Sequence, residues 1–483
     1  MSKKKKNKRQ KNQKKAQQAR FQEAKRKREA EMKEKARREA MPKPPKPPKP
    51  PKLPKLKADD PLVSTFQSLL AKSESSYVAP SDPHLAALNR RYNEFEAERE
   101  YEARIALFLK TMDEELMDEE NAFHMLSQIN DQSLKYGHEG RERVNSLVAL
   151  VRERLPDVYE EDLPYYLGWL STNAFSTNQL DSLADIADQA ATIAGKDLEY
   201  FEHIVSQFAY YGQLPLIVRM KHQGFPYLKE EADQYFYDVV GQFAASSTIY
   251  EILAYIEKNP TGDIKDPLLR ERITYYEQDN VEWKKMGKML EYVSGQASYQ
   301  CTLTDFGLQK DPSGAKHHFD RHNRRSLFHF TMGFVHYLHD TEGMSYSKAQ
   351  QVQHSMQNYL LKRQEDKLKP ESSTFERPKP RKRKGKRKTR TYKHDNFFVP
   401  DRKTLDYYFN DLMNEDKPHI YHIASMYETL PAWLRYLELH NFIDSERRGQ
   451  ALDELAGMKI HLIKKLDEWT NDFALLENTK NWW

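Results

Sequence analysis

Histidines concentrate in one part of this chain of 483 residues. Seven of its 17 histidines lie between residues 317 and 354. Three of them, His322, His329 and His336, are seven residues apart, a spacing that places side chains on one helix face. Seven residues of helix rise about 10 Å, which is too far for two imidazoles to share one ion. The His317–His339 cluster therefore has three readings, namely metal binding, contact with nucleic acid and ordinary packing, and we assign no metal ligand.

Other residues with reactive or ligand-binding side chains lack the partners that catalysis requires. Glu120 and His124 are one helical turn apart, but a di-metal carboxylate site needs Glu-x-x-His pairs on two helices. The tripeptide Asp305–Gly307 matches a kinase metal-binding motif by its residue types, but no glycine-rich loop precedes it. Cys301 has no activating neighbour and is interpreted as an inert buried thiol. We assign no catalytic residue and no cofactor, and an enzyme with an unrecognised site is the remote alternative.

A repeat of 35 residues between residues 161 and 260 provides the framework for the rest of the chain. In each unit, apolar positions at helical spacing follow an aromatic residue, and a small residue ends the pattern where a neighbouring helix could approach. The positions that we expect to pack between units are Tyr165, Tyr200, Tyr235, Ala174, Ala209 and Ala244. A weaker pattern, with Leu183, Val218 and Leu253 in register, predicts a second helix in each unit. Self-similarity at this period indicates stacked helical hairpins.

The start of each unit, an aromatic residue followed by two apolar ones, resembles tetratricopeptide and pentatricopeptide hairpins. Tyr166, Trp169 and Leu170 carry this resemblance in the first unit, and it covers about a hundred residues. It implies an all-α, right-handed superhelical solenoid. In pentatricopeptide arrays a polar residue just after the aromatic one helps to read an RNA base. Leu167 holds that place in the first unit, so we predict no base-by-base code.

The charge of the chain is divided unequally. Residues 1–57 contain 24 Lys and Arg against 5 Glu, and residues 376–393 contain 11 against 1. Subtracting these net charges of +19 and +10 from the whole-chain +5 leaves −24 for the remainder. Clustered Lys and Arg attract polyanions such as nucleic acid. The sequence thus predicts an acidic helical body with a basic disordered N-terminal arm and an internal basic loop.

The basic segments contain the residues that we expect to contact nucleic acid. In the proline-rich stretch 41–57, a lysine at every third position would follow one edge of a polyproline II helix. A solubilising spacer is an equal alternative, and recognition of the prolines by an aromatic groove is a third. The candidate contacts are Lys43, Lys46, Lys49, Lys52, Arg321, Arg324, Arg325, Arg381, Lys382, Arg383 and Lys384.

The sequence divides into folded and unfolded parts by composition and periodicity. Residues 84–112 read as one long helix, and another long helix closes the chain before the Trp482–Trp483 end. The predicted divisions are a basic arm at 1–57, a linker at 58–81, N-terminal helices at 82–160, repeats at 161–260, an irregular helical region at 261–370, a basic loop at 371–398 and C-terminal helices at 399–483.

These features predict an interaction protein. A single cysteine excludes an internal disulfide and suits a reducing compartment, and no apolar run is long enough for a membrane span. We therefore expect a soluble cytoplasmic protein, with a nuclear location as the alternative in a eukaryote. The first hypothesis is a non-enzymatic scaffold that binds a protein or peptide, with basic arms that contact RNA, the ribosome or another polyanion. The second is a nucleic-acid-binding protein without sequence preference. The oligomeric state is not predicted.

Overall fold

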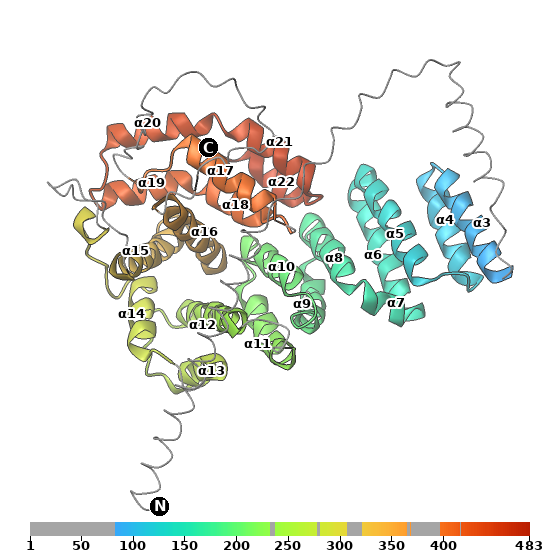
Figure 1. Ribbon diagram of the computed structural model, residues 1–483, viewed down its shortest axis with the longest axis horizontal. Helices are drawn as coiled ribbons and strands as arrows, with labels where there is room; N and C mark the ends of the chain where they lie inside the picture. Colours follow the sequence, from blue (N-terminus) through green and yellow to red (C-terminus); the bar gives the residue numbers. More distant parts are fainter. Residues whose placement is uncertain are drawn as a thin grey trace, which may run out of the picture. The chain divides into compact units, whose positions relative to one another are not determined.

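Helices form every regular element that the structure describes, which confirms the all-α class (Figure 1). This computed structural model describes residues 83–231, 237–277, 281–306, 321–364, 368, 397–415 and 417–483. The basic segment 1–57, the linker 58–81, most of the predicted loop 371–398 and Tyr235 lie outside these residues. The candidate contacts Lys43, Lys46, Lys49, Lys52, Arg381, Lys382, Arg383 and Lys384 lie outside them as well.

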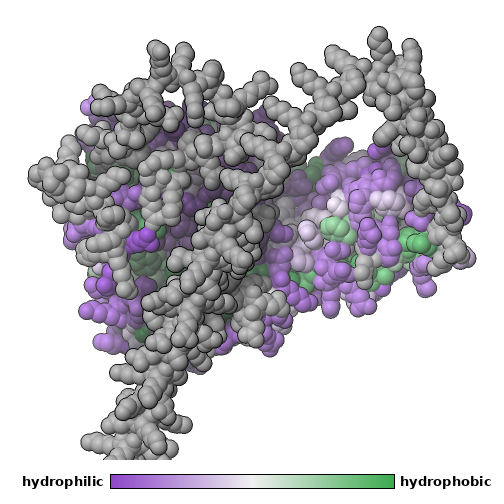
Figure 2. Space-filling model, in the orientation of Figure 1, coloured by the Kyte–Doolittle hydropathy of each residue, from purple (hydrophilic) through white to green (hydrophobic). Residues whose placement is uncertain are grey.

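The first helices of the body pack in chain order. They are α3 (Pro83–Ala97), α4 (Tyr101–Asp113), α5 (Glu119–Ser133), α6 (Gly137–Arg154) and α7 (Pro156–Glu161). The single helix predicted over 84–112 is wrong, because the chain turns between α3 and α4. There the Glu98 carboxylate accepts hydrogen bonds from the backbone N–H groups of Arg99 and Glu100, which replaces the helical pattern. In Figure 2, scattered apolar patches interrupt a largely hydrophilic surface over this part of the body.

Two helical hairpins follow, each at the position that the repeat predicts. The first pairs α8 (Leu163–Thr177) with α9 (Leu183–Thr192), and the second pairs α10 (Leu198–Tyr210) with α11 (Leu214–Glu230). The turns use left-handed backbone conformations, at Asn178 with φ 58° and at Gly212 with φ 78°. A side chain at position 212 would also meet Ser345, so the turn requires a glycine for two reasons. α11 packs against α9, which stacks the second hairpin on the first.

The third unit departs from the predicted hairpin. Its first helix, α12 (Tyr237–Lys258), continues through the place where the earlier units turn, and Leu253 is buried within it. The second helix expected at Leu253 is therefore wrong. Residues 247–253 contain no Gly, Pro or Asn that would end a helix, and the chain turns only at Asn259–Gly262, before α13 (Pro267–Glu277).

The rest of the chain adds helices that return to the repeats. α14 (Trp283–Val293), α15 (Arg321–Asp340) and α16 (Tyr346–Gln364) pack in order, and α17 (Arg402–Met413), α18 (Ile420–Glu428), α19 (Leu430–Leu439), α20 (Ser445–Ala456), α21 (Lys459–Trp469) and α22 (Phe473–Lys480) complete the body. The long helix predicted near the C-terminus is thus three helices. Aspartate N-caps explain two of these starts, because Asp444 and Asp472 accept hydrogen bonds from backbone N–H groups in the first turns of α20 and α22.

The C-terminal helices cover one side of the repeat hairpins. α16 packs against α10 and α12, α18 packs against α10, and α22 packs against α8. Of these, α8, α10 and α12 are the first helices of the three units. Trp483 stacks on Tyr427, and its indole N–H donates to the Tyr427 carbonyl at 3.0 Å, so the end of the chain docks on the body. The side of the repeats that would form an open groove is therefore partly occupied by the same chain.

One helical segment among the described residues is long and apolar enough to cross a membrane. It is Val239–Lys258 of α12, and 56% of its most apolar stretch is buried inside the body. Burial of this kind is what a core helix requires, because its apolar side chains contact α11, α13 and α16.

Candidate functional site

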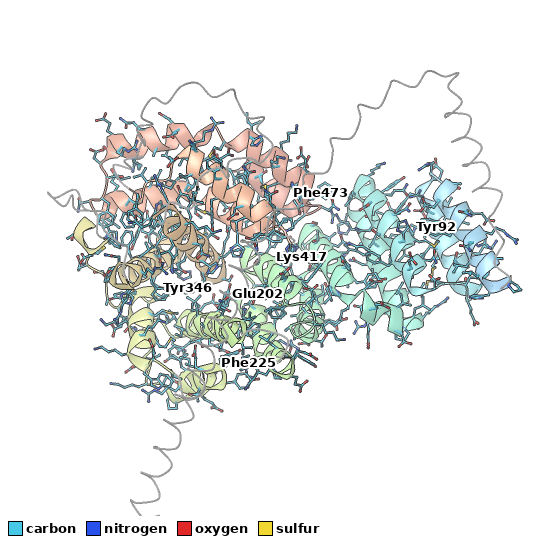
Figure 3. The ribbon with its side chains drawn as sticks, in the orientation of Figure 1. Tyr92, Glu202, Phe225, Tyr346, Lys417 and Phe473 are labelled. Carbon is cyan, nitrogen blue, oxygen red and sulfur yellow. The ribbon has the colours of Figure 1, made fainter. Side chains whose placement is uncertain are left out.

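Two adjoining cavities lie where the covering helices leave α10 exposed. The first, of about 390 Å³, is lined by residues of α10, α11, α12, α16 and the segment before α18. The second, of about 460 Å³, lies between the start of α10 and residues 414–419. Both are lined by Leu198, Glu202 and His419, and we call them together the repeat cleft. Figure 3 shows Glu202 and Lys417 between the repeat helices and the C-terminal helices.

An ion pair with one buried partner lies at the inner end of the repeat cleft. The Lys221 ammonium is 2.8 Å from the Glu202 carboxylate and donates to the Ser246 hydroxyl at 3.0 Å. Its side chain is 1% exposed, whereas that of Glu202 is 39% exposed. The ammonium also lies 4.4 Å from the centre of the Phe243 ring, which attracts a cation through its negative face. A buried lysine held by one carboxylate and aromatic faces is a fixed positive charge at the cleft wall.

Four histidines from three helices and one connecting segment gather around the cleft. His203 is on α10, His354 on α16, His419 before α18 and His422 on α18. The His422 ring centre is 5.9 Å from that of His354 and 5.5 Å from that of His419. The His203 ring lies 5.6 Å from the ring of Tyr421. This convergence of four imidazoles connects residues more than two hundred positions apart in the chain.

His422 is held between two serine hydroxyls. Its Nε2 is 3.1 Å from Ser206 Oγ, and its Nδ1 is 2.9 Å from Ser355 Oγ. A serine nucleophile next to a histidine base needs a group that orients the base and N–H donors for an oxyanion. Here the second ring nitrogen faces a hydroxyl, and Ser206 lies in the middle of α10, where backbone N–H groups are used by the helix. The Ser206–His422 pair is therefore better suited to binding and packing than to acyl transfer.

Burial keeps His203, His354 and His422 neutral by lowering the pKa of each. It lowers the pKa of His203 to about 4, and the nearby charges of His419 and Lys417 act in the same direction. Burial also lowers the pKa of His422 well below its ordinary value, together with the three neighbouring histidines. The pKa of His354 is lowered by burial against an opposing effect of Glu202. At neutral pH these three imidazoles are thus uncharged, beside the Lys221–Glu202 ion pair.

Tyrosines from two successive units lie beside Lys417, a residue that lines the second cavity. The rings of Tyr165 and Tyr200, 35 residues apart, are in edge-to-face contact at 5.7 Å. The Lys417 ammonium lies 4.3 Å from the centre of the Tyr200 ring and 5.4 Å from that of Tyr165. Tyr165 is 44% exposed, so it packs between units at the surface and not in the core. The repeat spacing therefore places an aromatic pair and a cation where a ligand could reach them.

A buried carboxylate fixes the C-terminal helices beside the cleft. Asp472, at the start of α22, accepts hydrogen bonds from the hydroxyls of Tyr211 at 2.8 Å and Tyr421 at 2.9 Å. Gln207 donates to it at 3.4 Å, and the Leu475 N–H donates at 3.0 Å. Burial raises the pKa of Asp472, while these hydrogen bonds act in the opposite direction. This cluster joins the repeat helix α10 to α18 and α22.

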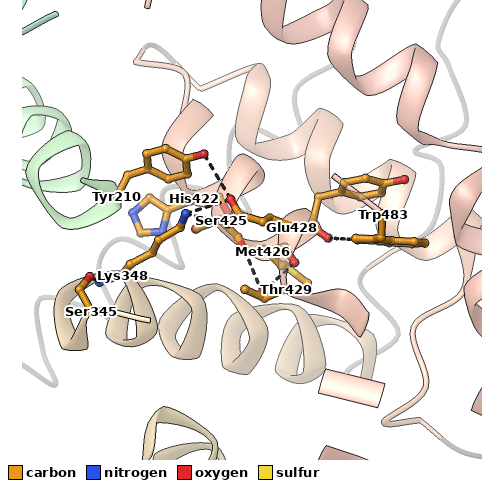
Figure 4. Close-up of polar contacts among 10 residues, drawn as sticks. Tyr210, Ser345, Lys348, His422, Ser425, Met426, Glu428, Thr429 and Trp483 are labelled. Atoms are coloured by element: carbon orange, nitrogen blue, oxygen red, sulfur yellow. Dashed lines mark hydrogen bonds and ion pairs between the residues drawn. The ribbon is translucent and has the colours of Figure 1, made fainter. Parts of the chain in front are cut away.

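A second polar contact joins the same helices (Figure 4). The Lys348 ammonium on α16 is 2.8 Å and 2.9 Å from the two carboxylate oxygens of Glu428 on α18. The Tyr210 hydroxyl on α10 donates to Glu428 at 3.2 Å, and Lys348 lies 4.0 Å from the centre of the Tyr210 ring. The wall of the repeat cleft is therefore held by paired charges and buried hydrogen bonds.

The structure separates the histidines that the sequence grouped together. His329 lies between the rings of Tyr292 and Tyr299, His336 lies against Gly295, and His339 stacks on Tyr346. The side chain of His322 lies outside the described residues. Among the residues that the structure describes, no group of three or more His, Cys, Asp or Glu is arranged to hold a metal ion.

The predicted alanines and the predicted arginines of α15 lie in different environments. Ala174, Ala209 and Ala244 are buried, with at most 5% of each exposed. Arg324 and Arg325 are exposed on α15, beside lysines of α14, and the side chain of Arg321 lies outside the described residues. Neither Arg324 nor Arg325 lines the repeat cleft.

Sequence reasoning missed most residues of the repeat cleft. Lys221, Glu202, His354, His419 and His422 belong to no local motif, and only their burial in the fold brings them together. The one available signal was the spacing of Tyr165 and Tyr200. Comparison with protein-family models, with curated proteins and with solved structures finds no match to this chain.

Proposed function

We propose that this chain is a non-enzymatic interaction scaffold, built as a solenoid of stacked helical hairpins, whose repeat cleft binds an extended segment of a partner protein. The observation that carries the proposal is the junction of the two cavities, which share lining residues and so extend as one hollow across α10. Helical repeats commonly bind partners along such surfaces. Because α16 and residues 414–419 form the opposite wall, the hollow is a slot that suits a single extended strand.

The lining of the cleft favours a peptide as its occupant. A cation beside an aromatic ring stands at each end, with Lys417 on Tyr200 at one end and Lys221 on Phe243 at the other. Between them, apolar side chains such as Leu198 alternate with polar ones such as Gln242. A peptide backbone can hydrogen-bond along such a surface while its side chains reach the ends. In this proposal the basic segments 1–57 and 376–393 add electrostatic affinity for RNA or another polyanion.

The test is a selection of peptides from a displayed random library with the full chain. Gln242 is exposed on α12 and lines the cleft, whereas Ala245 is exposed on the same helix and does not line it. We expect Gln242→Trp to weaken the selected peptides at least about tenfold, because the indole fills the slot, while Ala245→Trp leaves affinity unchanged. Peptides that bind both variants equally, or a selection that yields none, would contradict the proposal.

A further inference from the structure

Basic and aromatic side chains meet on α14 and α15, away from the repeat cleft. Lys284 and Lys285 are exposed on α14, Lys288 is half-buried one turn later, and α14 packs against α15, where Arg325 is exposed. The Lys285 ammonium is 6.0 Å from the centre of the Phe328 ring. We call Lys285, Lys288, Tyr292, Tyr299 and Arg325 the α14–α15 patch.

Aromatic rings form the floor of this patch. The Tyr292 and Tyr299 rings are 5.6 Å apart, and each lies within 5.4 Å of the His329 ring. Both tyrosines are half-buried, so their rings remain in part accessible, whereas His329 is buried beneath them. Burial and the positive charges of Arg325, Lys288 and Lys285 lower the pKa of His329 to about 4. These charges therefore converge on the aromatic floor.

Carboxylates also lie near the patch, and Glu291 acts on Tyr292. Glu282 and Glu291 are exposed on or beside α14. Burial raises the pKa of Glu277, while the charge of Lys285 acts against that effect. Asp305 accepts hydrogen bonds from the backbone N–H and the hydroxyl of Thr302, and its charge also acts on Tyr299. Lys285, Lys288 and Arg325 thus lie around His329, against which the two partly accessible tyrosine rings pack.

We propose that the α14–α15 patch binds single-stranded nucleic acid, separately from the peptide site in the repeat cleft. Proteins that bind single strands combine cations that follow the phosphates with aromatic rings on which bases stack. The bases of a duplex are already stacked, so a duplex can use only the cations. Partly accessible tyrosine rings with cations nearby therefore favour a single strand over a duplex. The residues of this site all lie outside the basic segments 1–57 and 376–393.

The first test removes two positive charges in the full chain. Lys285→Gln with Arg325→Gln is compared with Lys464→Gln with Lys480→Gln, two exposed lysines on α21 and α22. Both variants lose the same charge, so a general electrostatic effect is equal in the two. We expect the first pair to reduce the slope of log K against log salt by about 1.4 for a 12-nucleotide oligouridine, from about 0.7 per phosphate contact. Fluorescence anisotropy measures the slope, and equal slopes in the two variants would overturn the proposal.

The second test removes stacking without removing charge. Tyr292→Leu should weaken oligouridine and oligothymidine binding about tenfold, within the range that base stacking contributes. Tyr292→Phe keeps the ring and should bind as the wild type does, and a duplex should be unaffected by either change. Circular dichroism melts verify that both variants are folded. Equal binding by the Leu and Phe variants, or an equal loss with the duplex, would show a charged surface without a single-strand site.

Discussion

The two sides of α10 are built in different ways. Toward α8 and α11, its neighbours in the sequence, it buries apolar side chains such as Phe201, Ile204 and Phe208. Toward α16, α18 and α22 it presents polar groups, among them Gln207, which meets Asp472, and Ser206, which meets His422. The side that faces α8 and α11 follows the periodicity of the sequence. The side that faces α16, α18 and α22 depends on partners that the chain supplies some 150 to 265 residues later.

This difference explains why the repeat cleft exists. Apolar contacts are non-directional, so a repeat can pack against its neighbours with any apolar side chains of suitable volume. Hydrogen bonds and ion pairs are directional, so the polar contacts fix one position for the C-terminal helices. Between those fixed points the two surfaces do not fill the space, and the cavities remain.

The largest expected effect is on the polar side. Asp472→Ala removes the acceptor for Tyr211, Tyr421 and Gln207 and also removes the N-cap of α22. Buried donors left unpaired cost about 1–3 kcal/mol each, and a lost cap about 1 kcal/mol. We expect the free energy of unfolding to fall by about 4 kcal/mol in denaturant melts. Asp467→Ala, an exposed aspartate on α21, is the control and should change it by less than about 0.5 kcal/mol.

Overpacking the close contact of α10 should cost somewhat less. Ala209 is fully buried, and its carbonyl accepts a hydrogen bond from Ser347 on α16 at 3.2 Å. Ala209→Trp forces a large ring into this contact and should lower the free energy of unfolding by roughly 1–3 kcal/mol. Denaturant melts measure the change. A melt that matches the wild type would place residue 209 outside any helix contact.

The sequence predicted the side of α10 that faces α8 and α11 better than the side that faces α16, α18 and α22. Helical periodicity identifies Phe201, Ile204 and Val205 as core residues, and all three are buried. The 35-residue spacing also predicts the neighbouring positions of Tyr165 and Tyr200, whose rings touch. Such positions can be predicted because burial against a sequence neighbour repeats with the helix.

The repeat cleft could not be predicted in the same way. His203, His354 and His422 have unrelated local contexts, and only the return of α16 and α18 to α10 joins them. A histidine whose partner is two hundred residues away leaves no periodic signal. The sequence grouped the histidines of α15, but His329, His336 and His339 each pack against a different aromatic or glycine neighbour. The sequence did not predict the break between α3 and α4, because this break depends on the side chain of Glu98.

A change of pH should affect the polar side of α10. A histidine with a native pKa near 4 stays neutral in the folded chain, whereas the unfolded chain binds a proton below about pH 6.5. The unfolded state then binds more protons, so stability falls as the pH drops from 6.5 toward 4. For His203 the expected loss at pH 5 is about 2 kcal/mol. Thermal melts from pH 7 to pH 5 measure it, and His203→Gln should reduce the dependence because it removes one titrating group.

The pH dependence has contributions from outside the cleft that the experiment must separate. The pKa of His329 is also lowered to about 4, and burial lowers the pKa of His440. His203 itself is faced by His419 and Lys417 and by the rings of Tyr200 and Tyr421. His329→Gln is therefore the matched variant. If the two variants keep the full wild-type dependence, neither histidine is held neutral by the fold.

The smallest expected effect on stability belongs to Tyr165, whose ring lies beside the cleft residue Lys417. Its ring contacts Phe123 and Tyr200, and such aromatic pairs contribute about 0.5–1.5 kcal/mol. Tyr165→Ala should therefore lower the free energy of unfolding by about 1 kcal/mol, against about 3–5 kcal/mol for the fully buried neighbour Tyr166. The same change removes one face that holds Lys417, so selected peptides should bind more weakly to the Tyr165→Ala variant. Melts and peptide titrations on one preparation measure both. A large loss of stability without a loss of peptide affinity would make Tyr165 a packing residue and move the peptide site away from Lys417.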